Sequence, residues 1–265
     1  MPRTTPRIVL KSPREIELLR DAGRVVCRVL DEIERLVRPG VTTAALDARA
    51  AEVIAEAGAT PLFKGVRSPA ARVPFPACLC TSVNEQVVHG IPDERPLAPG
   101  DIVSVDCGVR LRGYCGDAAR TFAVGTPAPA IQRLLDVTRA ALDLAIREIA
   151  PGQRWSRIAR RMQACVEEAG CSVVREYVGH GIGQEMHEEP KIPNYCDRGT
   201  RSADFELAVG MTLAIEPMVT AGRAETRSGD DTGWPVVTKD GSWAAHFEHT
   251  VAVTPTGADV LTDGR

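Results

Sequence analysis

Two stretches of the sequence decide the fold: Leu97-Ala98-Pro99-Gly100-Asp101-Ile102-Val103-Ser104-Val105-Asp106 and Leu207-Ala208-Val209-Gly210-Met211-Thr212-Leu213-Ala214-Ile215-Glu216. Both begin with Leu-Ala-x-Gly, continue as an apolar run and end in a carboxylate, and residue 97 aligns with residue 207 at an offset of 110. Apolar strands normally exclude charge, because burying an unpaired carboxylate is very costly. We therefore expect each acid to point inward toward cations, such as metal ions, that compensate its charge. The pattern predicts a duplicated fold with one inward anion from each half.

The duplication extends to the helices. Pro39-Gly40 closes one helical stretch, and Gly58 ends the next one 18 residues later. Pro151-Gly152 and Gly170 repeat these helix-ending residues with the same spacing, at an offset of 112. Pro-Gly and Ala-Gly are also common helix endings, so coincidence is the alternative explanation. We expect an N-terminal tail at residues 1–10 and a single domain at 11–265, and the repeat predicts that its halves are about 11–125 and 126–265.

The first helix has a complete start signal. Ser12 can be its N-cap, Pro13 suits the first helical position, and Glu15 completes a capping box. Three further helices are expected, at residues 42–57 (capped by Thr42 or Thr43), 128–149 and 154–169. Pairs of helices between groups of strands, without strict alternation, predict an α/β fold of the α+β type with antiparallel sheet.

The composition excludes several classes of protein. A length of 265 residues allows one large domain or two, and a net charge of -3 gives no reason to expect a DNA partner. The eight cysteines include no Cys-x-x-Cys pair, so a zinc ribbon is not expected. The chain does not open like a signal peptide, and no apolar run approaches the roughly 18 residues of a membrane span. These features predict a reduced, soluble, cytoplasmic protein with no membrane partner.

Asp106 and Asp117 flank the turn Arg110-Leu111-Arg112-Gly113. A hairpin centred between residues 111 and 112 would place the two acids directly opposite each other, with Cβ atoms about 5 Å apart. Two anions so close repel each other unless a cation lies between them or one is protonated. The alternative is a pair of exposed acids beside a turn, and the apolar residues before Asp106 argue against it. The hairpin therefore predicts a cation site.

The histidines and two further acids complete the candidate site. Each histidine lies in a segment dense with glycine or acids, although each alone could equally be structural; they are His89, His180, His187, His246 and His249. The glycines around His180 allow a ligand to approach the backbone closely. Glu216 lies in Ile-Glu-Pro-Met and Glu248 in Phe-Glu-His-Thr. One histidine with four carboxylates is too rich in oxygen for structural zinc, but it suits two divalent ions that activate a shared water for hydrolysis.

Six motifs of the chain resemble those of the methionine aminopeptidases. They are Asn84-Glu85-x-x-x-His89-Gly90-Ile91-Pro92, Asp106 with Gly-x-x-Gly-Asp117, Gly179-His180-Gly181-Ile182-Gly183, His187-Glu188-Glu189-Pro190, Ile215-Glu216-Pro217-Met218 and Glu248-His249-Thr250. The resemblance covers residues 10–262 in the expected order. It implies the pita-bread fold, in which two pseudosymmetric halves surround a mixed, largely antiparallel sheet with helices on the outside. The short chain, without a zinc-binding extension, resembles the bacterial type I form.

The resemblance also implies a role for each residue of the site. The metal ligands would be Asp106, Asp117, His180, Glu216 and Glu248, of which Asp117 and Glu248 would bridge two divalent ions. Glu216 would also be the general base, His187 would stabilise the substrate's carbonyl oxygen, and His89 would contact the scissile nitrogen. The substrate's free amine would bind a metal ion, so a single residue is removed. The ions could be Co, Mn, Fe(II) or Zn, since this ligand set is compatible with all of them.

The methionine pocket departs from the family pattern. Family members usually have Cys near Pro61 and Phe near Met186. Relative to the family pattern, the stretch 66–73 looks like an insertion before Phe75. Met186 is flexible and can still accept a thioether side chain. The substrate-binding residues that the resemblance implies are His89, His187, Phe75, Cys80, Met186 and Trp234. For the apolar ones among them, ordinary core packing is the alternative.

The leading functional hypothesis is removal of the initiator methionine from nascent chains whose second residue is small. The resemblance implies a monomer that meets its substrates at the ribosome exit. A proline-directed aminopeptidase or prolidase is the first alternative, because those enzymes share the fold and the ligands, although they usually carry an extra N-terminal domain. A non-catalytic pita-bread binding protein is the second, although such proteins have typically lost metal ligands, whereas all five are present here.

Overall fold

A computed structural model describes residues 8–265. Most of the expected N-terminal tail, residues 1–7, therefore lies outside the described residues, and residues 8–10 form neither helix nor strand. The helices of the described chain are α1 (Pro13–Leu36), α2 (Thr43–Glu56), α3 (Pro129–Glu148), α4 (Trp155–Glu168) and the short α5 (Arg198–Ser202). The helices α2, α3 and α4 agree with the predicted ranges to within one residue, and α1 begins at the predicted Pro13, whereas α5 was not expected.

The start of α1 has the predicted capping box. The Ser12 side chain accepts a hydrogen bond from the Glu15 backbone N–H at 3.4 Å, and the Glu15 carboxylate accepts one from the Ser12 N–H at 2.8 Å. Two of the N–H groups that a helix start leaves without partners are satisfied in this way. In α2 the cap is Thr42, whose side chain accepts from the Ala45 N–H.

The described strands form four antiparallel sheets. In chain order they are β1 (Thr60–Pro61), β2 (Leu79–Val83), β3 (Gln86–Val88), β4 (Ile102–Leu111), β5 (Tyr114–Ala123), β6 (Ser172–Val173), β7 (Gly179–Gly181), β8 (Glu188–Ile192), β9 (Thr212–Ile215), β10 (Met218–Thr220), β11 (Thr226–Ser228), β12 (Val236–Thr238), β13 (Ala244–His246), β14 (His249–Thr254) and β15 (Gly257–Val260). In one sheet β1, β2 and β5 all pair with β4. Another sheet has the strand order β15-β14-β9-β7-β8. The other two sheets have three strands each, in the orders β13-β10-β6 and β11-β12-β3.

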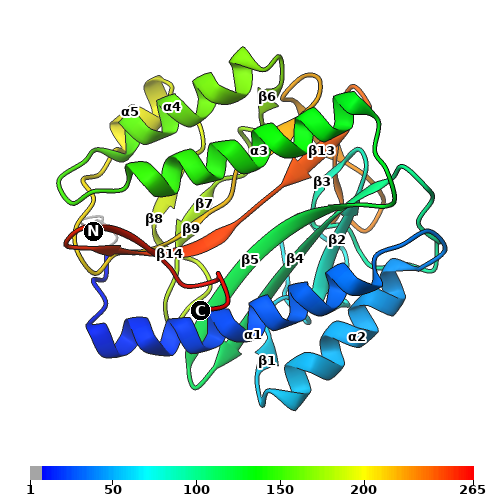
Figure 1. The fold of residues 1–265 in the computed structure, drawn as a ribbon, viewed down its shortest axis with the longest axis horizontal. Helices are drawn as coiled ribbons and strands as arrows, with labels where there is room; N and C mark the ends of the chain where they lie inside the picture. The colour runs from blue at the N-terminus through cyan, green and yellow to red at the C-terminus, as the bar shows by residue number, and fades with distance from the viewer. Residues whose placement is uncertain (1–7) are drawn as a thin grey trace.

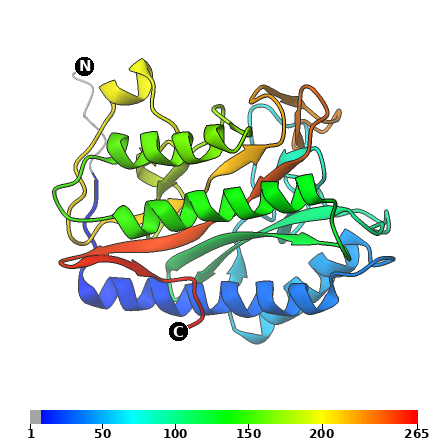
Figure 2. The same cartoon turned by 45° about the horizontal axis from the view of Figure 1, so that its top comes forward.

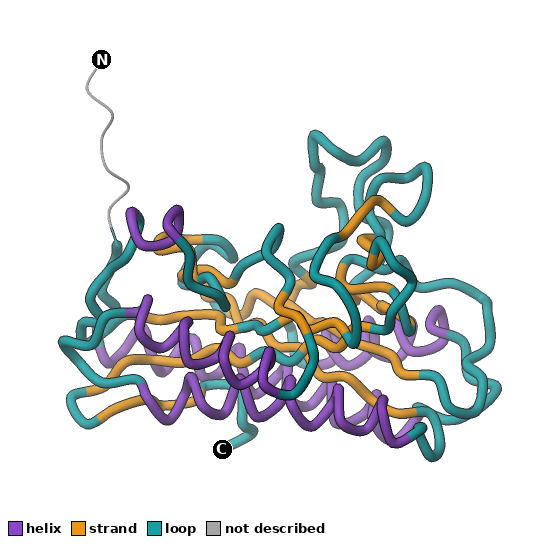
Figure 3. Tube along the Cα trace, turned by 90° about the horizontal axis from the view of Figure 1, so that it is seen from above, coloured by secondary structure: helices purple, strands orange, loops and turns teal. Residues whose placement is uncertain are grey.

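The helices cover one side of these strands. In Figure 1, α1 and α2 lie along one edge of the molecule and α3 and α4 along the other, with the strands between them. Figure 3 shows the four long helices on the same side of the strands, while loops project from the opposite side. Figure 2 shows α3 crossing over the central strands. The predicted α/β class, with antiparallel strands and helices on the outside, is confirmed.

Two large apolar clusters hold the layers together. One joins α1 and α2 to β2, β4 and β5, with side chains such as Leu30 and Leu46 fully buried. The other joins α3 and α4 to β9 and β14 and contains Trp155 and Ile158. Each fully buried aliphatic side chain contributes roughly 1.5–3 kcal/mol relative to an exposed one. The division of the domain near residue 125 stays a prediction. Within residues 8–265, no helix has both the length and the apolar character needed to cross a bilayer.

The β4–β5 hairpin differs from the predicted register. Leu111 pairs with Tyr114, so Asp106 lies opposite Ala119 and Asp117 lies opposite Gly108. The prediction that the two acids face each other directly was therefore wrong. The turn residues are Arg112 and Gly113, at φ 50° and 84°, which is the two-residue geometry that matches strand twist. Because the error is two residues, both acids still project from the same face of the hairpin.

Candidate active site

A single cavity of about 240 Å³ contains all the site residues that the sequence predicts. Its lining includes Phe75, Cys80, His89, Asp106, Asp117, His180, Met186, His187, Glu216, Trp234 and Glu248. These residues come from segments that span most of the chain, so the fold brings them together. No predicted site residue lies elsewhere.

The hairpin supplies the first two acids. Asp117 is only 4% exposed, and its Oδ1 has no hydrogen-bond partner within residues 8–265. The same holds for Oδ1 of Asp106. Cys80 pairs with Asp106 across the β2–β4 ladder, so its side chain projects on the same face. Burial raises the pKa of the Cys80 thiol well above its usual value, which leaves it a neutral, apolar part of the wall.

His180 lies in β7, and the local backbone determines its tautomer. Its Nδ1 is 3.0 Å from the carbonyl oxygen of Gly181, so Nδ1 carries the proton and Nε2 is free to bind a cation. The sequence predicted that the flanking glycines allow a ligand to approach, but in the structure they accommodate neighbouring backbone instead. A Cβ on Gly179 would lie 2.3 Å from the Ala214 carbonyl oxygen, and one on Gly181 would lie 2.3 Å from that of Glu189. The glycines are needed because neighbouring strands approach closely.

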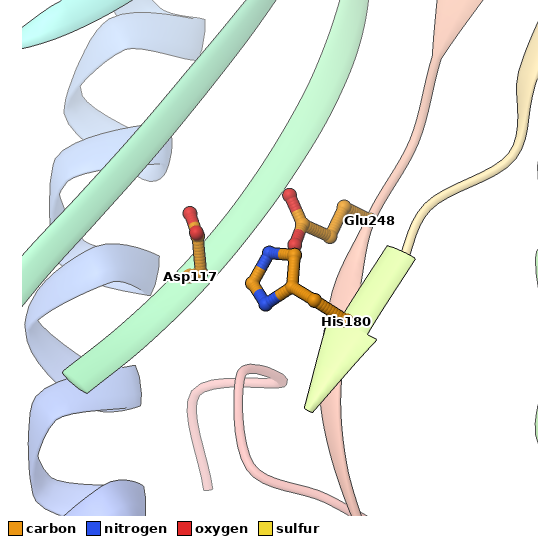
Figure 4. A group of neighbouring side chains, drawn as sticks. All are labelled: Asp117, His180 and Glu248. Carbon is orange, nitrogen blue, oxygen red and sulfur yellow. The ribbon is translucent and has the colours of Figure 1, made fainter. Parts of the chain in front are cut away.

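Glu216 and Glu248 supply the other two acids. Glu216 follows β9 directly, and Glu248 lies between β13 and β14, with its N–H donating to the Ala119 carbonyl oxygen at 2.9 Å. Oε1 of Glu216 is 3.6 Å from His180 Nε2. Asp117, His180 and Glu248 point toward one another, and each offers a ligand atom within 4.8 Å of the others (Figure 4).

The electrostatics of this cluster fit divalent cations. Oε1 of Glu248, like the Oδ1 atoms of Asp106 and Asp117, is buried without a hydrogen-bond partner among the described residues. Burial raises the pKa of Asp106 to about 7, and burial together with the neighbouring acids raises the pKa of Asp117 and of Glu248 well above the usual range. Leaving several buried oxygens without partners is costly, so the arrangement calls for bound positive charge. Carboxylate and imidazole groups together are a suitable ligand set for divalent transition metals.

We expect metal binding to release protons. An acid with a raised pKa keeps its proton in the metal-free protein, and a cation must displace that proton to bind. With Asp106 titrating at about pH 7, affinity for Zn(II) should therefore increase as the pH rises from about 5 to about 8. Calorimetry at about pH 6 in two buffers of different ionisation enthalpy would measure the released protons. An identical heat in both buffers would contradict this expectation.

The hydroxyl of Thr250 in β14 forms hydrogen bonds with the backbone of Asp117. It accepts a hydrogen bond from the Asp117 N–H at 3.2 Å and donates one to the Asp117 carbonyl oxygen at 2.8 Å. The side chain is fully buried. It therefore joins the strand that carries Asp117 to the segment that carries Glu248, and fixes the spacing of the two acids.

Replacement of Thr250 by valine tests this connection. We expect the variant to lose about 1–3 kcal/mol in the free energy of unfolding, because the backbone groups of Asp117 lose a buried partner. Metal affinity should fall about 10- to 100-fold, the usual effect of removing a group that orients a ligand. Thr226→Val on the edge strand β11 is the matched control. Wild-type affinity in Thr250→Val, measured by calorimetry, would show that Thr250 does not position Asp117.

The remaining cavity residues surround the cation cluster. His89 has a φ of 60°, and a non-glycine residue in this region stores about 1–3 kcal/mol of strain, which is typical of functional positions. Burial lowers the pKa of His89 to about 4, so it is neutral at pH 7. The ring of His187 lies 4.3 Å from that of His180. Trp234 packs edge-on against Phe75 with centroids 5.2 Å apart.

The segment at residues 66–73 forms part of this wall. The Arg72 N–H donates to the Thr232 carbonyl oxygen at 2.9 Å, and the Trp234 indole N–H donates to the Val73 carbonyl oxygen at 2.7 Å. Figure 2 shows the corresponding cyan and brown segments close together at one end of the molecule. This segment therefore fixes the tryptophan that lines the cavity.

Comparison with known proteins identifies the family. The model of Metallopeptidase family M24 matches residues 17–255. The chain belongs to metallopeptidase family M24. It is 46% identical over 255 residues to methionine aminopeptidase 1 of Bacillus subtilis, an alignment that covers 96% of this chain and 99% of that protein. It is similar to the crystal structure of methionine aminopeptidase from Thermotoga maritima, with a TM-score of 0.90, 43% identity and coverage of 97% and 99%. The predicted pita-bread fold and resemblance are confirmed.

More distant structures share the fold alone. The prolidase from Pyrococcus furiosus is 21% identical with a TM-score of 0.70, and the alignment covers 97% of this chain but only 66% of that one. The fold thus also occurs in longer chains, and identity of this degree carries no information on substrate.

Sequence reasoning missed residues of this M24 site. His246 lines the cavity, is 2% exposed, and places Nε2 3.5 Å from Oε2 of Glu216. Tyr177 packs edge-on against His89 at 5.5 Å. The signal for His246 is its position two residues before Glu248, since alternate residues of an extended segment project to the same side. No comparable signal marks Tyr177.

Proposed function

We propose that this chain removes the N-terminal methionine from proteins and peptides whose second residue is small. The observation that carries the proposal is a cavity in which a cation-binding cluster adjoins an apolar wall. Membership of family M24 and the likeness to methionine aminopeptidases over almost the whole chain support it. The apolar wall, with Phe75, Met186 and Trp234, suits a thioether side chain.

Two divalent cations are the proposed cofactor. Asp106, Asp117, His180, Glu216 and Glu248 would hold them. When bound, such a pair polarises the scissile carbonyl and lowers the pKa of a shared water. The number of ions and their identity among Co, Mn, Fe(II) and Zn are part of the proposal. The buried oxygens without partners support it.

The protein's own side chains then carry the proton transfers. Glu216 accepts the proton of the attacking water and delivers it toward the departing amine. His187 donates a hydrogen bond to the carbonyl oxygen as negative charge develops there. His89, neutral at pH 7 because of its lowered pKa, contacts the scissile nitrogen without adding charge next to the substrate's amine. The substrate's free amine would lie at the bound cations, which limits cleavage to the first bond.

His187→Ala tests the proposed stabilisation of the carbonyl oxygen. We expect kcat to fall about 10²- to 10³-fold, the usual cost of removing one donor to a developing oxyanion. KM should change little, because the hydrogen bond strengthens only in the transition state. Metal content, measured by atomic emission, should match that of wild type. A large rise in KM at constant kcat would assign His187 to substrate binding instead.

Two peptides distinguish this proposal from a proline-directed peptidase. We expect the metal-loaded protein to release methionine from Met-Ala-Ser and to leave Ala-Pro intact, with both products followed by chromatography. Cleavage of Ala-Pro alone would assign the chain to the proline-directed enzymes. Failure to cleave either peptide with both cations bound would favour a non-catalytic binding protein.

The partners and location follow from this substrate. The proposed partners are nascent polypeptide N-termini at the ribosome exit, met by a monomer in the cytoplasm. All eight cysteines, which lie within residues 8–265, are free thiols, which supports a reducing compartment. Neither DNA nor a membrane is a proposed partner. Co-sedimentation with translating ribosomes would test the ribosome contact.

A further inference from the structure

His246 is a buried histidine of the cavity that the proposed ligand set does not use. Its side chain is 2% exposed, and Nε2 has no hydrogen-bond partner within residues 8–265. A buried polar nitrogen without a partner is costly and requires an explanation. The atom that this nitrogen faces is Oε2 of Glu216, at 3.5 Å.

The distance between these atoms is long for a hydrogen bond. Hydrogen bonds from nitrogen to oxygen cluster at about 2.9–3.0 Å. Two ligands of one zinc ion, each about 2.1 Å from the metal and at right angles or tetrahedral, lie about 3.0–3.5 Å apart. The pair of His180 and Glu216, both of them proposed ligands, has a nearly equal separation of 3.6 Å. Glu216 therefore lies between two imidazoles in similar geometry.

A third group completes a site around His246. Glu216, His246 and Glu248 each offer one ligand atom, and these atoms all lie within 4.8 Å of one another. This group shares Glu248 with the group formed by Asp117 and His180. Two overlapping sets of ligand atoms that share one carboxylate suit two neighbouring cations.

The backbone of His246 is also held rigidly. Its N–H donates to the Thr121 hydroxyl at 2.9 Å, and its carbonyl oxygen accepts from the same hydroxyl at 2.8 Å. The Thr121 hydroxyl lies 2.9 Å from that of Ser104, so β4, β5 and β13 are joined at this point. The backbone segment that carries the imidazole is thus fixed in place before any cation binds.

We propose that His246 is a further metal ligand, which binds one divalent cation through Nε2 together with Glu216 and Glu248. This inference rests on the proposed metal site and adds a second nitrogen to it. Imidazole favours Zn and Fe over Mn, whereas carboxylates suit Mn. The second histidine therefore shifts the preference of the site away from Mn(II).

Nitrogen NMR of the imidazoles tests the proposal in the intact protein. The chain has only five histidines, so ¹⁵N-labelled side chains can be followed individually when Zn(II) is added. We expect Nε2 of His180 and of His246 to take the chemical shift of a metal-bound nitrogen, while His249, bonded to Thr262 at 2.8 Å, does not change. A single metal-bound imidazole, that of His180, would overturn the proposal without any mutation. No metal-bound imidazole at all would instead contradict the proposed metal site.

Two variants measure the contribution to affinity. His246→Gln keeps a hydrogen-bond donor near the position of Nε2 but removes the imidazole ligand, and His180→Gln is the reference for loss of a proposed ligand. We expect His246→Gln to bind Zn(II) about 10- to 100-fold more weakly and Mn(II) with a smaller loss. Unchanged Zn(II) affinity in His246→Gln, with a loss in His180→Gln, would refute the role of His246 and leave the proposed function intact. Loss in neither variant would refute both.

Discussion

Asp117→Asn should reduce methionine release about 10³- to 10⁴-fold at saturating metal. Asp117 is a proposed ligand of the two cations, and an amide does not supply the negative charge that would balance them. Loss of the several kcal/mol of charge stabilisation that a cation pair supplies corresponds to about this factor in rate. Methionine released from Met-Ala-Ser, with metal content measured on the same sample, gives the value.

The stability of the same variant distinguishes this account from simple misfolding. In the metal-free protein Asp117 lies among other buried acids, so a neutral amide should leave the melting temperature unchanged or higher. The wild type should gain more stability from added metal than the variant does. Asp231→Asn at the surface is the control for the chemical change. Wild-type turnover by Asp117→Asn with two cations bound would show that the ligand assignment is wrong.

Glu216→Gln should reduce kcat about 10²- to 10⁴-fold, because the amide cannot accept a proton from the attacking water. The replacement has almost the same shape, and its carbonyl oxygen can still face a cation. Peptide binding should therefore persist while turnover is lost. Steady-state kinetics on Met-Ala-Ser, together with calorimetric binding of the peptide, would separate the two effects.

Glu225→Gln is the control for this second change, since Glu225 is exposed. The residual rate of Glu216→Gln should no longer depend on pH in the range where the carboxylate acts as base. A variant that kept the wild-type rate and pH profile would mean that another group accepts the proton.

Local sequence signals predicted the helices well. The capping box of Ser12 and Glu15 and the Pro-Gly punctuation are short-range features, and the helices of the structure begin and end close to them. The predicted register of the β4–β5 hairpin was wrong, because the register depends on which two turn residues adopt left-handed backbone angles. Arg112 occupies such a conformation, which its residue type does not favour, so the turn centre lay one residue beyond the predicted position.

The site was predictable as a set of residue types but not as a geometry. The motifs identified acids and histidines that share one cavity, yet the partner of each atom depends on strand pairing. The glycines around His180 illustrate this limit, because the backbone that they accommodate belongs to other strands. His246 was counted among the histidines but was not joined to Glu216, since only the folded chain brings β13 next to β10.

Metal titration of the stripped protein tests the central claim most directly. The protein is treated with EDTA, freed of chelator, and supplied with Co(II) in half-equivalent steps while methionine release from Met-Ala-Ser is recorded. We predict no release without metal, and activity that rises until two equivalents are bound. Full activity of the stripped protein, or activity that does not change as metal is added, would contradict the claim that these acids and histidines act through bound cations.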